Sequence, residues 1–127
     1  MRVIIAGCGI GGSVLALALE QLAEQDNLEY LVLEQSPKLS EVGAGIQLSP
    51  NGVCILEWLG LGGDLAKFGV EPESHQLKNW QNGETVLQTP LGAVVKDKFG
   101  SPYYHAHRAD LIDALAVRLN PGRLRLN

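Results

Sequence analysis

The chain contains little cysteine, no cluster of basic residues and no long apolar run. Two cysteines, Cys8 and Cys54, are too few for a disulfide framework, so a reducing cytoplasm is the expected compartment. The net charge of −4 and the absence of a basic block argue against nucleic acid as a partner. No apolar stretch reaches the roughly 18 residues of a membrane-spanning helix, so we expect no membrane span.

The 127 residues suffice for one domain, or for one domain and part of another. Hydrophobic residues make up 46% of the chain, which is enough to form a core. The 15 glycines are many for this length and are typical of a loop-rich nucleotide-binding fold.

The N-terminal segment has the order expected of a βαβ nucleotide-binding unit. The parts are an apolar strand, a glycine turn, an amphipathic helix, a second strand and an acid: Val3–Ala6, Gly7-x-Gly9-x-x-Gly12, Ser13 to about Gln25, Glu29–Leu33 and Glu34. Because the first strand has no polar break, we expect it to be covered on both faces.

Each element of this pattern has a physical role in binding a dinucleotide. Gly7 permits a tight turn, Gly9 lets the backbone approach a pyrophosphate, and Gly12 lets the helix lie close to the strand. The helix N-terminus then attracts the phosphates. Glu34 lies 22 residues after Gly12, where a carboxylate accepts hydrogen bonds from a ribose and disfavours the 2′-phosphate of NADP. The alternative is a βαβ unit whose glycine turn binds no nucleotide.

A second informative segment surrounds Ala44. The glycines of Gly43-Ala44-Gly45 predict close approach of the backbone to a ligand ring. Ser49 and Pro50 predict a helix start, with Ser49 as the cap and Pro50 in the first turn, and this helix is expected to end near Leu59.

The remaining pattern changes in character near residue 72. Asn82-Gly83 is typical of a type I′ hairpin between two antiparallel strands. The predicted elements are one or two helical turns at 64–68, hairpin strands at 75–81 and 84–88, an irregular connection at 89–100, an extended piece at 103–106, a helix from 108 to about 119 and the start of a strand at 123–126.

Several residues carry weaker signals. His105 and His107 would share one face of a strand, but no third ligand lies at a suitable spacing, so no metal site is predicted. Cys8 is expected to pack beneath the glycine turn, and Trp58 and Trp80 are expected to be packing residues. No nucleophile arrangement is recognisable, so the catalytic residues stay unassigned.

Four motifs in this order resemble a known family. They are Gly7-x-Gly9-Ile10-Gly11-Gly12, Val32-Leu33-Glu34-Gln35, the segment from Glu41 to Asn51, and His107-Arg108-Ala109-Asp110-Leu111. Together they resemble the N-terminal part of FAD-dependent aromatic hydroxylases of the salicylate hydroxylase type, which are single-component flavoprotein monooxygenases. The resemblance covers nearly the whole chain.

The resemblance implies FAD, with NAD(P)H as a transient co-substrate that has no glycine fold of its own. It places Gly7, Gly9 and Gly12 at the pyrophosphate and Glu34 on the adenosine ribose. It also places Ala44 and Gly45 beside the flavin and Arg108 in contact with FAD. On its residues alone, Arg108 is equally consistent with a surface arginine at a helix start.

The expected fold class is α/β: a Rossmann-like FAD-binding βαβ unit followed by the start of an antiparallel substrate-domain sheet. The expected parts are residues 1–71 for FAD binding, 72–106 for the hairpin and connection, and 107–127 for the FAD-contacting helix and an incomplete strand. Family members are longer and carry later motifs, so we expect a truncated piece that is inactive alone.

The predicted function is therefore the FAD-binding portion of a monooxygenase that hydroxylates a small aromatic substrate using NAD(P)H and O₂. Two alternatives stay open, an NAD-dependent Rossmann oxidoreductase and a non-catalytic nucleotide-binding remnant. Unfinished sheet edges favour self-association of such a piece.

Overall fold

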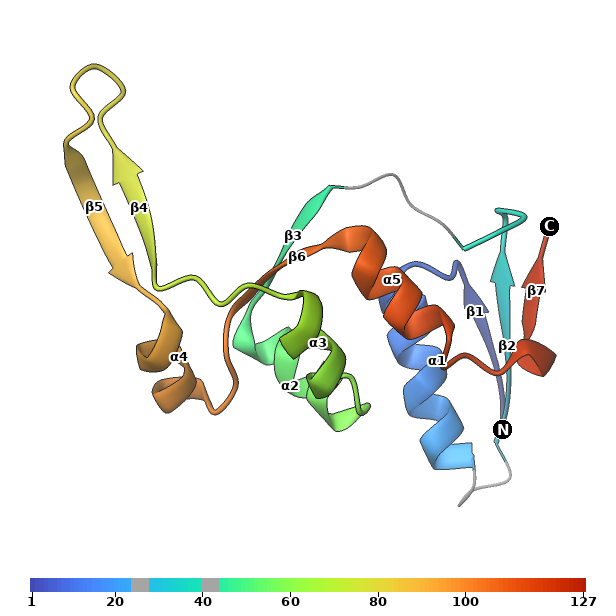
Figure 1. Cartoon of the computed structure of the whole chain (residues 1–127). Helices are drawn as coiled ribbons and strands as arrows, with labels where there is room; N and C mark the ends of the chain where they lie inside the picture. The colour runs from blue at the N-terminus through green and yellow to red at the C-terminus, as the bar shows by residue number, and fades with distance from the viewer. Residues whose placement is uncertain (24–27, 40–43) are drawn as a thin grey trace. The chain divides into compact units, whose positions relative to one another are not determined.

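A computed structural model describes residues 1–23, 28–39 and 44–127 of this mixed α/β chain (Figure 1). The chain divides into two compact units, Met1–Ala44 with His107–Asn127, and Gly45–Ala106. Among the described residues, no helix has the length and apolar character needed to cross a membrane.

The first unit contains a parallel sheet with the strand order β1-β2-β7. Its strands are β1 (Arg2–Ala6), β2 (Glu29–Glu34) and β7 (Leu124–Leu126). Arg2 aligns with Glu29 and Ala6 with Leu33, so β1 and β2 run in register to the same edge of the sheet. The residues that follow Ala6 and Leu33 therefore emerge side by side at the carboxyl edge.

One face of this sheet is covered by α1 (Ile10–Ala23), and α5 (Arg108–Ala116) packs against α1. Ala16 is fully buried. The predicted amphipathic helix is present as α1, although two of its apolar side chains, Leu15 and Leu22, are exposed. The helix also begins three residues earlier than Ser13, at Ile10.

The opposite face of the sheet is exposed, which contradicts the expectation that β1 is covered on both faces. Ile5 and Val32 point toward α1 and are buried. Their neighbours Ile4 and Leu33 point the other way and are 63% and 42% exposed. Side chains alternate along a strand, so an apolar strand needs a second layer for its other face, and the described residues of this unit do not supply one.

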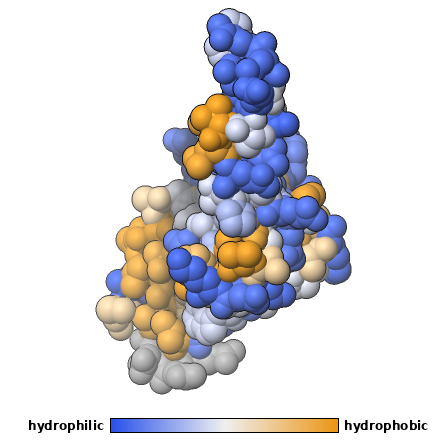
Figure 2. All heavy atoms as spheres, turned by 90° about the vertical axis from the view of Figure 1, so that its left-hand side faces the viewer, coloured by the Kyte–Doolittle hydropathy of each residue, from blue (hydrophilic) through white to orange (hydrophobic). Residues whose placement is uncertain are grey.

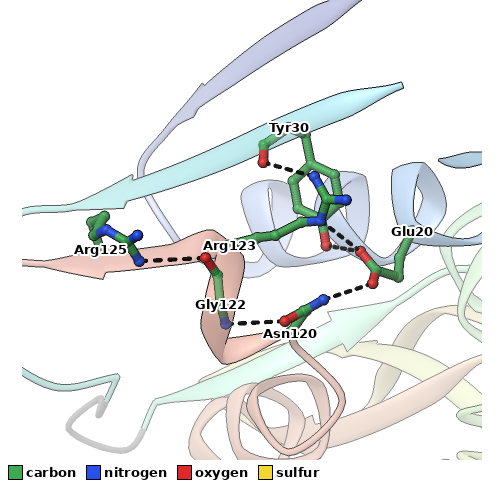
Figure 3. A network of polar contacts seen from close by, with 6 residues as sticks. All are labelled: Glu20, Tyr30, Asn120, Gly122, Arg123 and Arg125. Atoms are coloured by element: carbon green, nitrogen blue, oxygen red, sulfur yellow. Dashed lines mark hydrogen bonds and ion pairs between the residues drawn. The ribbon is translucent and has the colours of Figure 1, made fainter. Parts of the chain in front are cut away.

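A polar network ties β7 to the rest of the first unit (Figure 3). Glu20 accepts hydrogen bonds from the Tyr30 hydroxyl and from Asn120, whose Nδ2 lies 2.9 Å from Glu20 Oε1. The Arg123 guanidinium stacks 4.8 Å from the Tyr30 ring centroid, and its Nε lies 3.6 Å from Glu20 Oε2. These contacts, the Tyr30 hydrogen bond most of all, lower the pKa of Glu20. They hold the 3₁₀ turn η1 (Pro121–Arg123) beside β2.

In the second unit, β3 (Gly45–Leu48) pairs with β6 (Tyr104–His107), and two helices follow β3 in the chain. These are α2 (Pro50–Trp58) and α3 (Gly62–Phe68). The core of this unit contains Val53, Leu56, Leu61 and Leu65, which are all buried. Pro50 occupies the first turn of α2 as predicted, but Ser49 makes no side-chain cap, because its Oγ donates to Asn51 Oδ1 at 2.5 Å instead.

The predicted hairpin is present as β4 (Ser74–Lys78) and β5 (Thr85–Pro90), which pair antiparallel. The predicted type I′ turn is wrong. That turn requires positive φ at both central residues, whereas Gly83 has φ +75° and Asn82 is not among the described residues with positive φ, all of which are glycines. A longer loop closes the hairpin, in which Gly83 N donates to Asn79 O at 2.8 Å. Below this hydrophilic tip, apolar side chains reach the surface of the hairpin (Figure 2).

Two further predictions for this unit are wrong. The segment predicted as an irregular connection contains a helix, α4 (Gly92–Phe99). Its last turn carries Lys96 and Lys98, which complement the helix dipole, and Gly100 caps it at φ +84°. The tryptophans Trp58 and Trp80 are not core residues, and Trp80 is 89% exposed at the hairpin loop.

The two units are the compact parts of this chain. They meet between residues 44 and 45 and between residues 106 and 107. The division into residues 1–71, 72–106 and 107–127 stays a prediction about the domains of the protein.

Candidate functional site

The glycine turn of the first unit joins β1 to α1. Gly7 has φ +94°, which favours glycine, and its N–H donates to Leu33 O at 2.7 Å. A Cβ atom on Gly12 would lie 2.0 Å from Gly7 O, a distance that no side chain can occupy. Gly12 is therefore required by the close packing of α1 against the turn.

Gly9 and Gly11 have a different environment, because a Cβ atom on either would meet nothing within 4 Å. Packing within the described chain therefore does not require glycine at these positions. The first N–H groups of a helix lack intrahelical partners, and α1 has no acidic residue in its first turn. The open space over these two glycines can thus admit an anion at the positive end of the helix.

Glu34 lies next to this turn at the end of β2. Its Oε2 accepts a hydrogen bond from Cys8 N at 2.6 Å, and its Oε1 accepts one from Ser36 N at 2.9 Å. The hydrogen bond from Cys8 is the main reason that the pKa of Glu34 is lowered, followed by that from Ser36. A carboxylate offers about four lone-pair positions. Glu34 can therefore still accept hydrogen bonds from ligand hydroxyl groups.

A small crevice of about 70 Å³ opens between these residues. Its lining residues come from the glycine turn, the end of β2, the following loop and α5: Cys8, Gly9, Glu34, Ser36, Lys38, Leu39 and Ile112. The sequence-based prediction missed Ser36, Lys38 and Ile112. The signal for Ser36 was its position two residues after the strand-end acid, where a loop at the carboxyl edge of a parallel sheet meets a ligand.

The structure places Arg108 and Ala44 together, since Arg108 N donates to Ala44 O at 2.9 Å. Arg108 is the first residue of α5, and its Nε atom is buried. Gly45 is exposed at the start of β3 in the second unit. The glycine turn and Glu34 thus form one cluster within the first unit, and Ala44 with Arg108 forms a second contact in that unit.

The remaining candidate residues, Cys8, His105 and His107, lie outside any group that could hold a metal ion among the described residues. Cys8 is buried, with its Sγ 3.5 Å from Ser13 Oγ, so it packs beneath the turn as predicted. His105 and His107 both point outward from β6, and the His105 ring contacts the Tyr103 ring edge-on. Within the described ranges, no group of three His, Cys, Asp or Glu side chains could hold a metal ion.

The site fits the adenosine end of a dinucleotide such as FAD. The space over Gly9 and Gly11 and the N-terminus of α1 suit a pyrophosphate. Glu34 retains acceptor capacity for ribose hydroxyls, and Lys38 supplies a cation to the same crevice. These features together mark the carboxyl edge of the sheet as the candidate binding site.

Comparison with known proteins shows which class of enzymes the chain is similar to. No family model matches the chain. The chain is nevertheless similar, over most of its length, to monooxygenases and hydroxylases of small aromatic compounds. The predicted resemblance to FAD-dependent aromatic hydroxylases is thereby confirmed.

Two relatives illustrate the extent of this sequence similarity. The chain is 40% identical over 126 residues to 3-amino-4-hydroxybenzoate 2-monooxygenase from Streptomyces cremeus, which covers 99% of this chain and 31% of that enzyme. It is 37% identical over 111 residues to 3-hydroxybenzoate 6-hydroxylase from Klebsiella oxytoca, covering 87% of this chain and 27% of that enzyme.

A solved structure gives the same result for the fold. Klebsiella pneumoniae HpxO complexed with FAD and uric acid superposes with a TM-score of 0.80 and 28% identity, covering 99% of this chain and 30% of that chain. The chain thus spans less than a third of the length of the proteins it matches, and it corresponds to their N-terminal part.

Proposed function

We propose that this chain is the FAD-binding portion of a monooxygenase that hydroxylates a small aromatic substrate with NAD(P)H and O₂. The observation that carries the proposal is the Glu34 carboxylate, held against Cys8 N beside the open N-terminus of α1. The similarity to aromatic monooxygenases over 99% of the chain supports it.

In this proposal the first unit is a Rossmann-like FAD-binding unit. Gly7, Gly9 and Gly12 form the turn that lets the N-terminus of α1 approach the pyrophosphate, and Glu34 accepts hydrogen bonds from the adenosine ribose. Ala44, Gly45 and Arg108 lie toward the flavin. When bound, FAD supplies the redox chemistry between NAD(P)H, O₂ and the aromatic ring.

The chain by itself is proposed to bind the cofactor without turnover. It spans 31% of the length of the Streptomyces cremeus relative, and turnover is proposed to need the length that this chain does not cover. The chain is also proposed to self-associate, because Ile4 and Leu33 leave an apolar sheet face exposed.

Calorimetric titration with FAD and with ADP, which carries the adenosine end, tests the proposal. Glu34→Gln removes a charged acceptor, and hydrogen bonds to charged groups contribute about 1.5–3 kcal/mol. We therefore expect this variant to bind ADP about tenfold or more weakly. Glu29→Gln is the matched control, since Glu29 begins the same strand and pairs with Arg2 away from the crevice. It is expected to bind ADP like the unmodified chain.

Two results would overturn the proposal. Tight binding of NAD with no measurable binding of FAD would favour the dehydrogenase alternative. Equal ADP affinity in the Glu34 and Glu29 variants would show that the carboxylate beside the glycine turn does not contact the ribose.

A further inference from the structure

The chain contains two Asn-Gly pairs, Asn51-Gly52 and Asn82-Gly83, in different structural settings. In such a pair the backbone nitrogen of glycine can attack the side-chain amide carbon of asparagine, because glycine has no Cβ atom to block the approach. The first pair lies in α2, and the second lies in the loop that joins β4 to β5 (Figure 1). The structure around each pair therefore determines whether it can react.

The Asn82-Gly83 pair is in the exposed loop of the hairpin. Both residues are exposed to solvent, and Gly83 has φ +75°. A Cβ atom on Gly83 would meet nothing within 4 Å, so the space around this glycine is open. The Gly83 nitrogen donates a backbone hydrogen bond to Asn79 O at 2.8 Å. Because exposed loops open at little cost in free energy, this nitrogen is often released to react.

Two hydrogen bonds orient the Asn82 side chain. Its Oδ1 accepts from Glu84 N at 3.1 Å, and its Nδ2 donates to Glu84 Oε2 at 2.8 Å. The hydrogen bond to Oδ1 draws electron density from the amide carbonyl and makes Cγ more electrophilic. The amide carbon of Asn82 is thus polarised for attack by the nitrogen of the following residue.

The Asn51-Gly52 pair is held in the first turn of a helix. Gly52 N donates to Ser49 O at 2.9 Å, and Val53 N donates to the same oxygen at 3.0 Å. Closure of the five-membered ring requires a ψ angle at asparagine outside the helical range. The first turn of α2 must therefore unfold before Asn51 can react.

We propose that Asn82 is a site of spontaneous deamidation. The Gly83 nitrogen attacks Cγ of Asn82, the Cγ–Nδ2 bond breaks, and ammonia leaves with the proton that the Gly83 nitrogen gives up through water. One water molecule then adds to either carbonyl carbon of the resulting succinimide. Opening of the ring gives aspartate or isoaspartate at position 82, and in isoaspartate the main chain runs through the side-chain carbons. Water is the co-reactant.

Either product changes the contacts of the hairpin loop. The Nδ2 of Asn82 donates to the Glu84 carboxylate, whereas the carboxylate that replaces the amide cannot donate. Two negative charges at hydrogen-bonding distance repel each other. Isoaspartate also lengthens the main chain between Asn79 and Glu84, where Asn79 N donates to Glu84 O at 2.8 Å. Deamidation should therefore loosen the end of the hairpin that carries the loop.

The test is incubation of the full chain at mildly alkaline pH, followed by peptide mass spectrometry at each asparagine. We expect Asn82 to convert at least about tenfold faster than Asn51, because a helical residue must first unfold locally. In urea, where neither structure remains, the two pairs should convert at similar rates. Equal rates in the folded chain, no conversion at Asn82, or a difference that persists in urea would overturn the inference.

Matched variants test the consequence for the hairpin. Asn82→Asp introduces the charge directly, and amide hydrogen exchange in β4 and β5 should become faster by up to about fivefold, as for loss of an exposed polar contact. Asn51→Asp makes the same change in the first turn of α2, where the helix dipole favours a negative charge, and should leave exchange in the hairpin unchanged. Equal exchange in the two variants would contradict the expected loosening.

A third variant tests the reaction itself. Asn82→Gln keeps the amide but lengthens the side chain by one carbon, so ring closure would form a larger ring. This variant should show no conversion at position 82 over the time in which the unmodified chain reacts. Conversion at an unchanged rate would show that the Gly83 nitrogen does not attack the side chain and would overturn the inference.

Discussion

At the scale of single residues, two neighbouring glycines at the start of α1 differ in whether the chain's own packing requires glycine. Gly12 is fixed by contact with the chain itself, since an added Cβ would collide with Gly7 O at 2.0 Å. Gly11, one position earlier, faces open space. Substitutions at these neighbours therefore separate packing from ligand access.

Gly12→Ala is predicted to destabilise the chain, because α1 must move away from the turn. Overpacking of this kind costs about 1–3 kcal/mol. Gly11→Ala should instead be neutral or stabilise by up to about 1 kcal/mol, since alanine is the better helix former and meets no neighbour. Urea unfolding followed by circular dichroism measures both changes. Equal midpoints for the two variants would contradict the packing role of Gly12.

Glu34 is predicted to stabilise the fold in a pH-dependent manner. Its pKa is lowered in the folded chain relative to the ordinary value of 4.5. The stabilisation is therefore complete above that value and is lost as the pH falls through the lower folded pKa. The difference in unfolding free energy between the chain and Glu34→Gln should shrink as the pH is lowered from neutrality into this range. Parallel pH profiles would contradict this prediction.

The sequence identified Glu34 because its offset from the glycine turn follows from strand and helix lengths. It could not identify Cys8 N as the donor to this carboxylate, because every residue except proline carries a backbone N–H. Lys38 was missed for a related reason. Its place in the crevice depends on the path of the loop after β2, and local propensity does not determine that path.

At the scale of elements, strongly periodic segments were predicted best. The helix at α5 and the strands at β1 and β2 follow the apolar pattern, whereas α4 does not. The two valines of α4 have low helix propensity. The residues typical of a helix, Lys98 and the C-terminal cap Gly100, are at the end of α4. The Asn82-Gly83 pair was over-interpreted, because hairpin loops longer than two residues also use glycine at positive φ.

The attachment of β7 gives a prediction at this scale. Asn120 bonds Glu20 through Nδ2 and accepts from Gly122 N at 3.0 Å, so it both joins η1 to α1 and caps the turn. Asn120→Ala should cost about 1–2 kcal/mol. Hydrogen exchange should accelerate first at the amides of β7. Gln21→Ala, an exposed change on α1, is the control and should leave β7 exchange unchanged.

At the scale of the molecule, the sequence predicted the α/β class and the switch to antiparallel pairing. It did not predict which surfaces lack a covering layer. The pattern Val3-Ile4-Ile5-Ala6 indicates burial on both faces of β1, and one of those faces is exposed in the structure. The apolar pattern of a strand shows that a sheet face requires a covering layer, but it does not show which segment or molecule supplies that layer.

This exposed face leads to the last prediction. Contiguous apolar surface promotes association, so the chain should form concentration-dependent oligomers in sedimentation velocity experiments. Ile4→Glu places a charge in the centre of the sheet face and should shift the chain toward monomer. Leu22→Glu adds the same charge to an exposed apolar position on α1, away from that face, and should leave the oligomers intact. If both variants dissociate equally, net charge controls association; if neither does, the sheet face is not the interface.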